Sequence, residues 1–213
     1  MQQEQIIQSL NRRYATKVFD PSKKIDDTTM QTLLESLRLA PSSFGIQPRW
    51  FVRVVNPTIR KKLREYARDQ SQITDASDLI VICRKKAVDV MLVQSYIDTI
   101  SQERWVTKDS LDGFKNMMLG FVDQKTPEWL AQRSDKQSYI ALWFLLETAA
   151  LLEIDACPME WFEPAKFDEV LWLEDLGLAS IAIVALGYRS VDDKYARLPK
   201  VRFATQSIIH TIS

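Results

Sequence analysis

The segment Arg12–Asp20 reads RRYATKVFD and concentrates positive charge near the start of the chain. Its three cations are Arg12, Arg13 and Lys17. Arginine presents a planar fork of N–H donors that matches a phosphate group, whereas lysine presents a single point charge. Such residues are usually solvated surface charges when they stand alone. Whether this segment forms a binding site therefore depends on further cations elsewhere in the chain.

A second basic segment lies near the other end of the chain, where residues 198–203 read LPKVRF. Lys200 and Arg202 alternate with Val201, so they project to the same side of an extended backbone. Pro199 favours such an extended conformation. Each hydrogen bond from a charged group contributes about 1.5–3 kcal/mol, so three or four supply much of the roughly 8 kcal/mol that micromolar binding needs. The two segments together predict an anionic cofactor that both ends of one fold hold.

The overall composition limits the classes of protein to which the chain can belong. At 213 residues, of which 46% are hydrophobic, the sequence predicts one domain over residues 1–213 with a substantial core. Lysine plus arginine and aspartate plus glutamate both count 28, and this balance argues against a general nucleic-acid-binding protein. A small anion needs only a local cluster of cations, so a neutral chain is compatible with the predicted cofactor.

Three further features concern location and metals. The polar start of the chain, MQQEQ, predicts no signal peptide. The longest apolar stretch, Tyr139–Leu152, is shorter than the roughly 20 residues of a membrane span, so we expect no membrane partner. Cys83 and Cys157 lie far apart and match no metal-ligand spacing, which predicts buried thiols, no metal site and a reducing compartment. These features favour the cytoplasm.

Helical patterns outnumber strand patterns along the chain. Apolar spacing and capping residues predict a helix capped by Asp27 and further helices that begin near Pro57, Lys86, Ser110, Thr126 and Pro164. β-rich stretches predict strands over residues 50–55, 79–83, 181–186 and 207–212. The chain has only five glycines and no glycine-rich phosphate loop, so Rossmann and P-loop folds lose support. Strict βαβ alternation is missing, which favours an α+β sandwich with a central sheet flanked by helices.

Five blocks of sequence occur in an order and at separations that match a known family: RRYATKVFD, APSSFGIQPRWF, ITDASDLIVIC, CPMEWF and LPKVRF. On these blocks the chain resembles the FMN-dependent nitroreductase family, in its branch of oxygen-insensitive NAD(P)H nitroreductases and dihydropteridine reductases. The resemblance covers almost the whole chain. It implies an α/β/α sandwich with a mostly antiparallel sheet, an intertwined homodimer with FMN sites at its interface, and NADH or NADPH as the reductant.

The resemblance also implies a set of cofactor-binding residues. The positions that match the family's FMN contacts are Arg13, Tyr14, Ala15, Lys17, Pro41, Ser42, Ser43, Gly45, Asp69, Gln72, Gln137, Pro158, Met159, Glu160, Lys200 and Arg202. Among them, Arg13, Lys200 and Arg202 are expected to bind the phosphate. Lys17 is expected at the pyrimidine edge, where its charge tunes the flavin. A backbone N–H near Glu160 is expected to point at the hydride-accepting nitrogen, so no side chain is predicted to be catalytic.

The other matched positions correspond to residues that contact the flavin rings in the family or reach them from the partner subunit. Asp69 and Gln72 fall where the family contacts the pyrimidine ring. Residues 41–45 fall where the family reaches the flavin from the partner subunit, and Gln137 on the long helix is a weaker match. Gly45 stands where asparagine is common in the family. The residues predicted to contact the substrate, because they flank blocks that face the flavin, are Phe44, Trp161 and Phe162.

The resemblance implies reduction of nitroaromatic or quinone-like acceptors by NAD(P)H through FMN, with ping-pong hydride transfer. The single histidine, His210, excludes a Ser-His-Asp triad. Two alternatives stay open. A flavin destructase or reductive dehalogenase would cover the flavin with additional lid residues, and the variable helical region at residues 105–125 is where they would lie. A non-catalytic flavin carrier or redox sensor would result if Trp161 fills the acceptor space.

Overall fold

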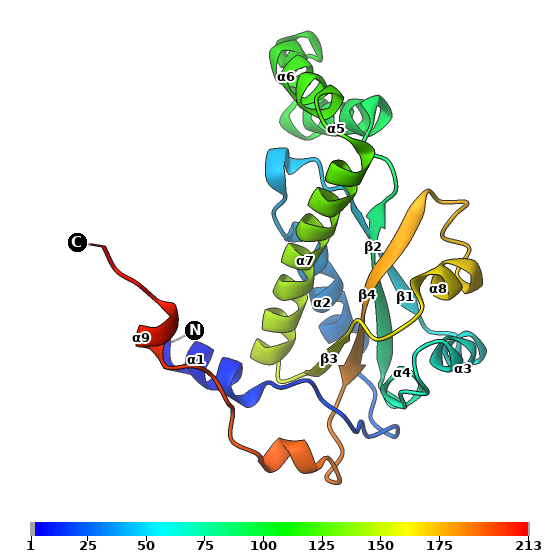
Figure 1. Ribbon diagram of the computed structural model, residues 1–213, viewed down its shortest axis with the longest axis vertical. Helices are drawn as coiled ribbons and strands as arrows, with labels where there is room; N and C mark the ends of the chain where they lie inside the picture. Colours follow the sequence, from blue (N-terminus) through cyan, green and yellow to red (C-terminus); the bar gives the residue numbers. More distant parts are fainter. Residues whose placement is uncertain (1–2, 213) are drawn as a thin grey trace.

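The computed structural model describes residues 3–212 and surrounds one sheet with helices (Figure 1). Within these residues the sheet has four strands in the order β1-β2-β4-β3, and every neighbouring pair is antiparallel. The strands are β1 (Arg49–Val54), β2 (Asp78–Lys85), β3 (Asp155–Met159) and β4 (Leu178–Gly187). The predicted α+β class with a central antiparallel sheet is therefore confirmed.

Strand β2 shows why the sheet is buried on both faces. Successive side chains of a strand point to opposite faces, and those of β2 enter two different core clusters. Leu79, Val81 and Cys83 belong to one cluster, whereas Ile80 and Ile82 belong to the other. All five side chains are buried. The uninterrupted apolar run that predicted this strand is thus a consequence of helices on both sides of the sheet.

Two layers of helices supply these clusters (Figure 1). On one face, α2 (Asp27–Leu39) packs beside the long α7 (Pro127–Leu151). On the other face lie α3 (Pro57–Glu65), α4 (Gln72–Asp75) and α8 (Pro164–Val170). This is the predicted α/β/α sandwich. No helix among the described residues is both long enough and apolar enough to cross a membrane.

The remaining elements lie outside the two layers. In Figure 1, α5 and α6 project beyond the first turns of α7 at the top, whereas α1, α9 and the C-terminal tail lie near its other end. The bounds of these elements are α1 (Gln3–Arg12), η1 (Ser43–Gly45), α5 (Val90–Arg104), η2 (Asp109–Leu111), α6 (Asp112–Asp123), η3 (Lys194–Arg197) and α9 (Thr205–Ile208).

Two predicted helix starts are wrong by a few residues. The cap of α2 is Asp26, not Asp27, because the Asp26 carboxylate accepts a backbone hydrogen bond of 2.9 Å from the third residue of the helix. Helix α5 begins at Val90 rather than Lys86, since Asp89 caps it in the same way. In both cases the aspartate side chain that satisfies a free N–H group fixes the boundary.

Two strand predictions also need correction. Strand β3 was not predicted because it is short and contains Pro158, which cannot donate to a sheet ladder; β3 accordingly lies at the edge of the sheet. The strand predicted over residues 207–212 is wrong, because the chain forms α9 there and then continues without regular structure. The tail is β-rich in composition, yet Ile208, Ile209 and Ile212 are exposed and no strand among residues 3–212 pairs with it.

Candidate functional site

A cleft of about 530 Å³ lies between the segment that follows α1 and the arm that follows η3. Arg13, Tyr14 and Ala15 line it from the first segment, and Lys200 and Arg202 line it from the arm. Across 187 positions of sequence, the Lys200 ammonium group donates a hydrogen bond of 2.5 Å to the backbone oxygen of Arg13. The two basic ends of the chain therefore meet, as their charge pattern predicted.

Burial and mutual repulsion lower the pKa values of two of these cations, Arg13 and Lys200. Burial, and then the nearby charge of Arg202, lowers the pKa of Arg13. Burial, followed by the charges of Arg13 and Arg202, lowers the pKa of Lys200. Cations that face one cleft raise each other's electrostatic energy, and an anion between them removes that cost. Two guanidinium forks and one ammonium group are a donor set that fits a phosphate ester.

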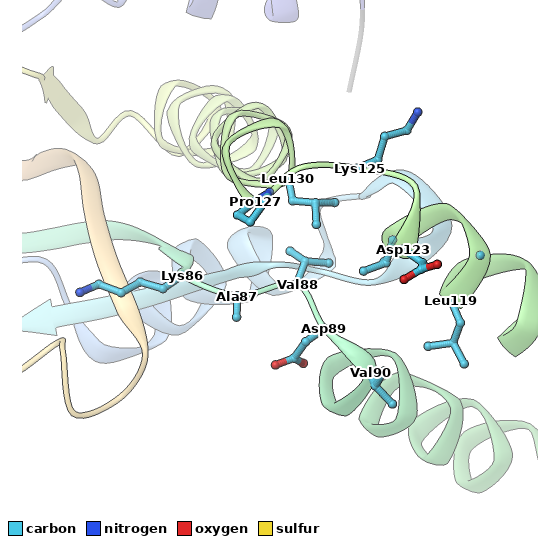
Figure 2. A pocket seen from close by; sticks show the side chains of 12 residues that line it. Lys86, Ala87, Val88, Asp89, Val90, Leu119, Asp123, Lys125, Pro127 and Leu130 are labelled. Atoms are coloured by element: carbon cyan, nitrogen blue, oxygen red, sulfur yellow. The ribbon is translucent and has the colours of Figure 1, made fainter.

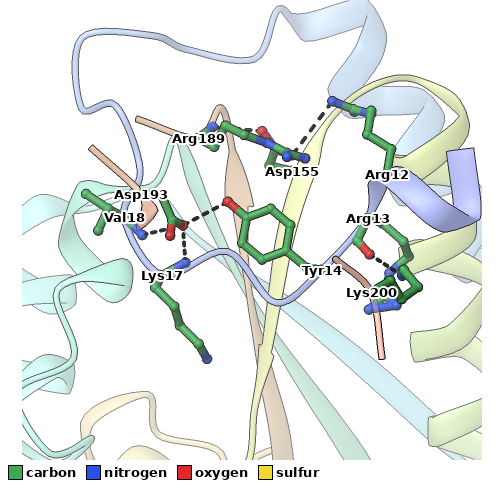
Figure 3. A network of polar contacts seen from close by, with 9 residues as sticks. All are labelled: Arg12, Arg13, Tyr14, Lys17, Val18, Asp155, Arg189, Asp193 and Lys200. Atoms are coloured by element: carbon green, nitrogen blue, oxygen red, sulfur yellow. Dashed lines mark hydrogen bonds and ion pairs between the residues drawn. The ribbon is translucent and has the colours of Figure 1, made fainter. Parts of the chain in front are cut away.

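Asp193 holds the first segment in place (Figure 3). The Tyr14 hydroxyl donates to its carboxylate at 2.9 Å, and the backbone N–H groups of Lys17 and Val18 donate at 2.7 and 3.1 Å. The backbone N–H of Tyr195 donates to the other carboxylate oxygen at 3.0 Å. Burial alone raises the pKa of Asp193, but these hydrogen bonds outweigh burial and lower it. Asp193 thus joins the two chain segments that form the cleft.

A second carboxylate, Asp155 at the start of β3, extends this network. The backbone N–H and Nε of Arg189 donate to it at 2.7 and 2.9 Å, and the Arg12 guanidinium lies 3.9 Å away. The Arg189 guanidinium also lies 4.6 Å from the centre of the Tyr14 ring. Burial, followed by the hydrogen bond to Asp193, raises the pKa of Tyr14 to about 12. The Tyr14 hydroxyl therefore keeps its proton and remains a donor.

The first segment also pairs with the edge of the sheet. Ala15 forms an isolated parallel bridge with Ala156 of β3. Lys17 follows close to Cys157: burial raises the pKa of that thiol, and the charge of Lys17 opposes this effect. In Figure 3 the Lys17 side chain points away from the carboxylate network. Lys17 is thereby placed along the strand that leads to residues 158–160.

The end of β3 is tied to helix α7. The Tyr139 hydroxyl donates to the Glu160 carboxylate at 2.5 Å. Burial, and then this hydrogen bond, raises the pKa of Tyr139, so its hydroxyl stays protonated. Neither the sequence pattern nor the resemblance pointed to Tyr139, which reads as one more residue of a long apolar helix.

A third segment meets the chain just after β3. The Gln70 amide donates to the backbone oxygen of Trp161 at 3.0 Å, and the Arg68 guanidinium lies 4.7 Å from the centre of the Trp161 ring. Next to these residues, the exposed Asp69 carboxylate accepts a hydrogen bond of 2.7 Å from Arg64. The predicted positions 69 and 161 therefore lie in adjacent segments.

Two other predicted residues are less accessible. Gln72, the first residue of α4, is buried. The Phe162 ring packs edge-on against Phe167, with ring centres 4.6 Å apart, and belongs to the rim of a core cluster. Core packing accounts for much of the Phe162 side chain, and its contact with substrate stays a prediction.

The loop at residues 41–45 is fixed to the first half of α7. The backbone oxygen of Pro41 accepts a hydrogen bond of 2.8 Å from Arg49. The backbone N–H of Ser43 donates to the buried Gln137 amide oxygen at 2.7 Å, and Arg133 donates to the Ser43 hydroxyl. Gln137, predicted as a weak FMN match, thus also anchors the loop.

Helix α7 divides the predicted residues into two groups. Successive residues of an α-helix are rotated by about 100°, so Gln137 and Tyr139 point about 160° apart, to nearly opposite sides of the helix. Gln137 bonds Ser43, whereas Tyr139 bonds Glu160. Within one chain, the loop at residues 41–45 and the end of β3 therefore contact different sides of the helix.

Glycine is required at position 45 of this loop. Gly45 has a φ of +76°, and a Cβ atom there would lie 1.9 Å from the Tyr96 hydroxyl of α5. We expect Gly45→Ala to lower the free energy of unfolding by about 1–2 kcal/mol, because alanine is strained in the left-handed region and Tyr96 must move. Denaturant unfolding measures this change.

Gly120→Ala is the matched control, because nothing lies within 4 Å of a Cβ atom there and a helical alanine is favoured over glycine. A Gly45→Ala variant as stable as the wild type would show that this loop is not held as described.

A separate cleft of about 630 Å³ lies at the base of the α5–α6 pair (Figure 2). Its walls are residues 86–90, where the chain leaves β2, and parts of residues 119–130, where the chain passes from α6 into α7. Two lysines and two aspartates are its charged groups, so their charges balance. None of the predicted FMN or substrate residues lines it. The basic cleft is therefore the candidate site for an anion.

Several residues of the site were not found from the sequence. Asp193 shows only the local signal of a polar turn before η3, yet it bonds residues 176 and 175 positions away. Arg133 reads as an ordinary helix cation, although its partner Ser43 lies 90 positions away. Aspartate in a polar turn and arginine on a helix are common, so neither signal identifies a distant partner.

Known proteins resemble this chain in sequence and in fold. Residues 10–188 match the sequence model of the nitroreductase family. A Staphylococcus haemolyticus protein, named as an inferred NAD(P)H nitroreductase, is 37% identical over 99% of this chain and 98% of the relative. A solved Bacillus subtilis structure has a TM-score of 0.87 at 16% identity, covering 99% of this chain and 100% of that one. An Exiguobacterium sibiricum structure in complex with FMN has a TM-score of 0.82 at 20% identity, covering 97% of each chain.

The family match spans most of the chain, and the relative aligns over nearly its whole length. The solved structures share the same fold at low identity. The chain therefore belongs to the nitroreductase family.

Proposed function

We propose that the protein is an FMN-dependent NAD(P)H oxidoreductase that reduces nitroaromatic or quinone-like acceptors with ping-pong kinetics. The observation that carries this proposal is the convergence of Arg13, Lys200 and Arg202 on one cleft. The FMN complex of the Exiguobacterium neighbour and the name of the Staphylococcus relative support the cofactor and the reductant. When bound, FMN accepts a hydride from NADH or NADPH and supplies the reducing equivalents for the acceptor.

The residues of the chain bind and tune this cofactor. Arg13, Lys200 and Arg202 hold the phosphate through charge-assisted hydrogen bonds. Lys17 stabilises negative charge at the pyrimidine edge, and a backbone N–H near Glu160 donates to the flavin ring. The other proposed FMN contacts are Tyr14, Ala15, Asp69, Gln72, Gln137, Pro158 and Met159, and the proposed substrate contacts are Phe44, Trp161 and Phe162.

We propose a homodimer in which residues 41–45 of a second copy cover the flavin. The division of the site by α7 supports this arrangement, because one chain does not bring both groups of residues together. The helix also exposes large apolar side chains, with Trp143 50% and Phe144 37% accessible. Exposed apolar patches of this kind mark interfaces between proteins.

The same proposal includes the extent of the domain, a lid-like region and the cellular compartment. Residues 1–213 are proposed to form one domain, in which residues 105–125 are a variable lid-like region; the projection of α6 beyond the sandwich supports this role (Figure 1). The cytoplasm is the proposed compartment, supported by two free and buried cysteines, Cys83 and Cys157.

Steady-state kinetics test the proposed reaction. We expect purified protein to carry flavin absorbance and to oxidise NADH or NADPH when a quinone or nitroaromatic is added. Because nicotinamide and acceptor occupy the same place in turn, double-reciprocal plots at several fixed acceptor concentrations are expected to give parallel lines. Intersecting lines would contradict the ping-pong proposal.

The same assays separate the alternatives. Release of halide from a haloaromatic under reducing conditions would assign the protein to reductive dehalogenation. Destruction of the flavin during turnover would assign it to the destructases. Retention of flavin without turnover of any acceptor would indicate a carrier or redox sensor.

A further inference from the structure

Arg133 of α7 lies at the centre of an aromatic cluster. Its guanidinium carbon is 4.9 Å from the ring centre of Phe121 and 5.6 Å from the ring centres of both Phe44 and Trp129. The rings also contact one another edge-on: Phe44 and Phe121 at 5.0 Å, and Phe121 and Trp129 at 5.6 Å. We call these four residues the Arg133 cluster.

The cluster joins two consecutive helices to a loop that is far from them in the sequence. Phe121 belongs to α6, Trp129 and Arg133 belong to the first turns of α7, and Phe44 belongs to the loop at residues 41–45. Arg133 also donates a hydrogen bond to the hydroxyl of Ser43 in that loop. Its planar group can stack on rings and donate to a hydroxyl at the same time, which lysine cannot do equally well.

The loop needs such support because its backbone is strained. Phe44 has a φ of 60° and Gly45 a φ of 76°. A phenylalanine in the left-handed region is uncommon and persists only where surrounding contacts enforce it. Here the contacts come from Arg133 and Phe121 on one side and from Tyr96 of α5 at Gly45. The conformation of Phe44 therefore depends on the α5–α6 pair.

We infer that Arg133 is a positioning residue for the acceptor, because it holds the Phe44 ring in place. Through this contact, residues of α6 such as Phe121 influence how the acceptor binds over the flavin. This inference rests on the proposed function, in which the loop at residues 41–45 covers the flavin of a second copy. The FMN phosphate is held elsewhere, by the basic cleft. Loss of Arg133 should therefore weaken acceptor binding much more than cofactor binding.

The test compares Arg133→Met, Arg133→Lys and a control, Gln132→Ala, in the full-length flavin-loaded protein. Gln132 is the exposed neighbour of Arg133 on the same helix. We expect Arg133→Met to raise the KM of a two-ring nitroaromatic by about tenfold or more, with smaller changes in kcat, because a misplaced contact lowers binding more than the chemical step at saturation. Arg133→Lys should fall between Arg133→Met and wild type, and Gln132→Ala should match wild type.

FMN affinity and melting temperature are measured for each variant. A purely structural role would lower stability and cofactor retention together and leave the KM of folded, loaded enzyme unchanged; that outcome overturns the inference. If wild type neither retains flavin nor oxidises NAD(P)H, the proposed function fails. If wild type is active and the KM is insensitive to Arg133, only the present inference fails.

A double-mutant cycle tests the link to α6 separately. Phe121→Leu removes the ring that both Phe44 and Arg133 contact. If Arg133 acts through this cluster, Phe121→Leu combined with Arg133→Met raises the acceptor KM little more than Arg133→Met alone. Effects that multiply would show that the two residues act independently and would overturn the inference. Phe121→Leu with Arg133→Lys repeats the cycle if the methionine variant does not fold.

Discussion

Replacing Lys200 and Arg202 together by alanine is expected to weaken FMN binding by about 100-fold or more. Each charge-assisted hydrogen bond contributes about 1.5–3 kcal/mol, and about 1.4 kcal/mol changes an affinity tenfold. Both side chains line the basic cleft, and Lys200 also carries a bond to Arg13. Flavin fluorescence titration of the apoprotein measures the dissociation constant.

A control with the same loss of charge is available in η3, just before the arm. Lys194 and Arg197 are exposed residues of η3 that do not line the cleft. Lys194→Ala with Arg197→Ala should therefore leave FMN affinity close to that of wild type. If both double variants weaken FMN equally, general positive charge and not the cleft attracts the cofactor. If neither does, the phosphate assignment is wrong.

Replacement of Asp193 by asparagine is the second change with a large expected effect. The carboxylate accepts hydrogen bonds from Tyr14, Lys17, Val18 and Tyr195 while it is itself buried. Loss of hydrogen bonds to a charged acceptor costs about 1.5–3 kcal/mol, which corresponds to a fall in Tm of about 3–12 °C for a domain of this size. FMN affinity should fall as well, because the segment that carries the phosphate-binding arginine loosens.

The dependence of Tm on pH tests whether the charged carboxylate of Asp193 is the source of this stabilisation. Hydrogen bonds lower the pKa of Asp193 despite its burial. The stabilisation is therefore fully present above the unfolded pKa of about 3.9 and is lost as pH falls through the lower folded value. The difference in Tm between wild type and Asp193→Asn should shrink as pH is lowered below about 4. Asp192→Asn, at an exposed neighbouring position, should show no such difference.

Much of the fold could be predicted because its signals are local. The apolar run of β2 reports burial on both faces, and the threonine and proline at the start of α7 report its first turn. Strand β3 was not predicted, because Pro158 interrupts the β-rich sequence pattern of this edge strand. The tail was taken for a strand because its composition favours β-structure, but a strand also needs a partner, and composition does not reveal one.

The residues of the site also fall into those that the sequence predicted and those that it did not. The two basic segments together predicted an anion held by both chain ends, and the family resemblance pointed to Arg13, Lys200 and Arg202 within them. The residues that position them are different. Asp193 and Arg133 are ordinary in their local context, and their roles appear only when the fold brings distant segments together. Which side of α7 each group of residues contacts was also invisible in the sequence, because it depends on the fold of the loop.

The most direct measurement compares FMN with riboflavin, which has the same ring system but no phosphate, by calorimetric titration of the apoprotein. If both chain ends bind the phosphate, wild type should bind FMN about 100-fold or more tightly than riboflavin. In the Lys200→Ala and Arg202→Ala double variant this preference should largely disappear. Equal affinity of wild type for the two flavins would contradict the account.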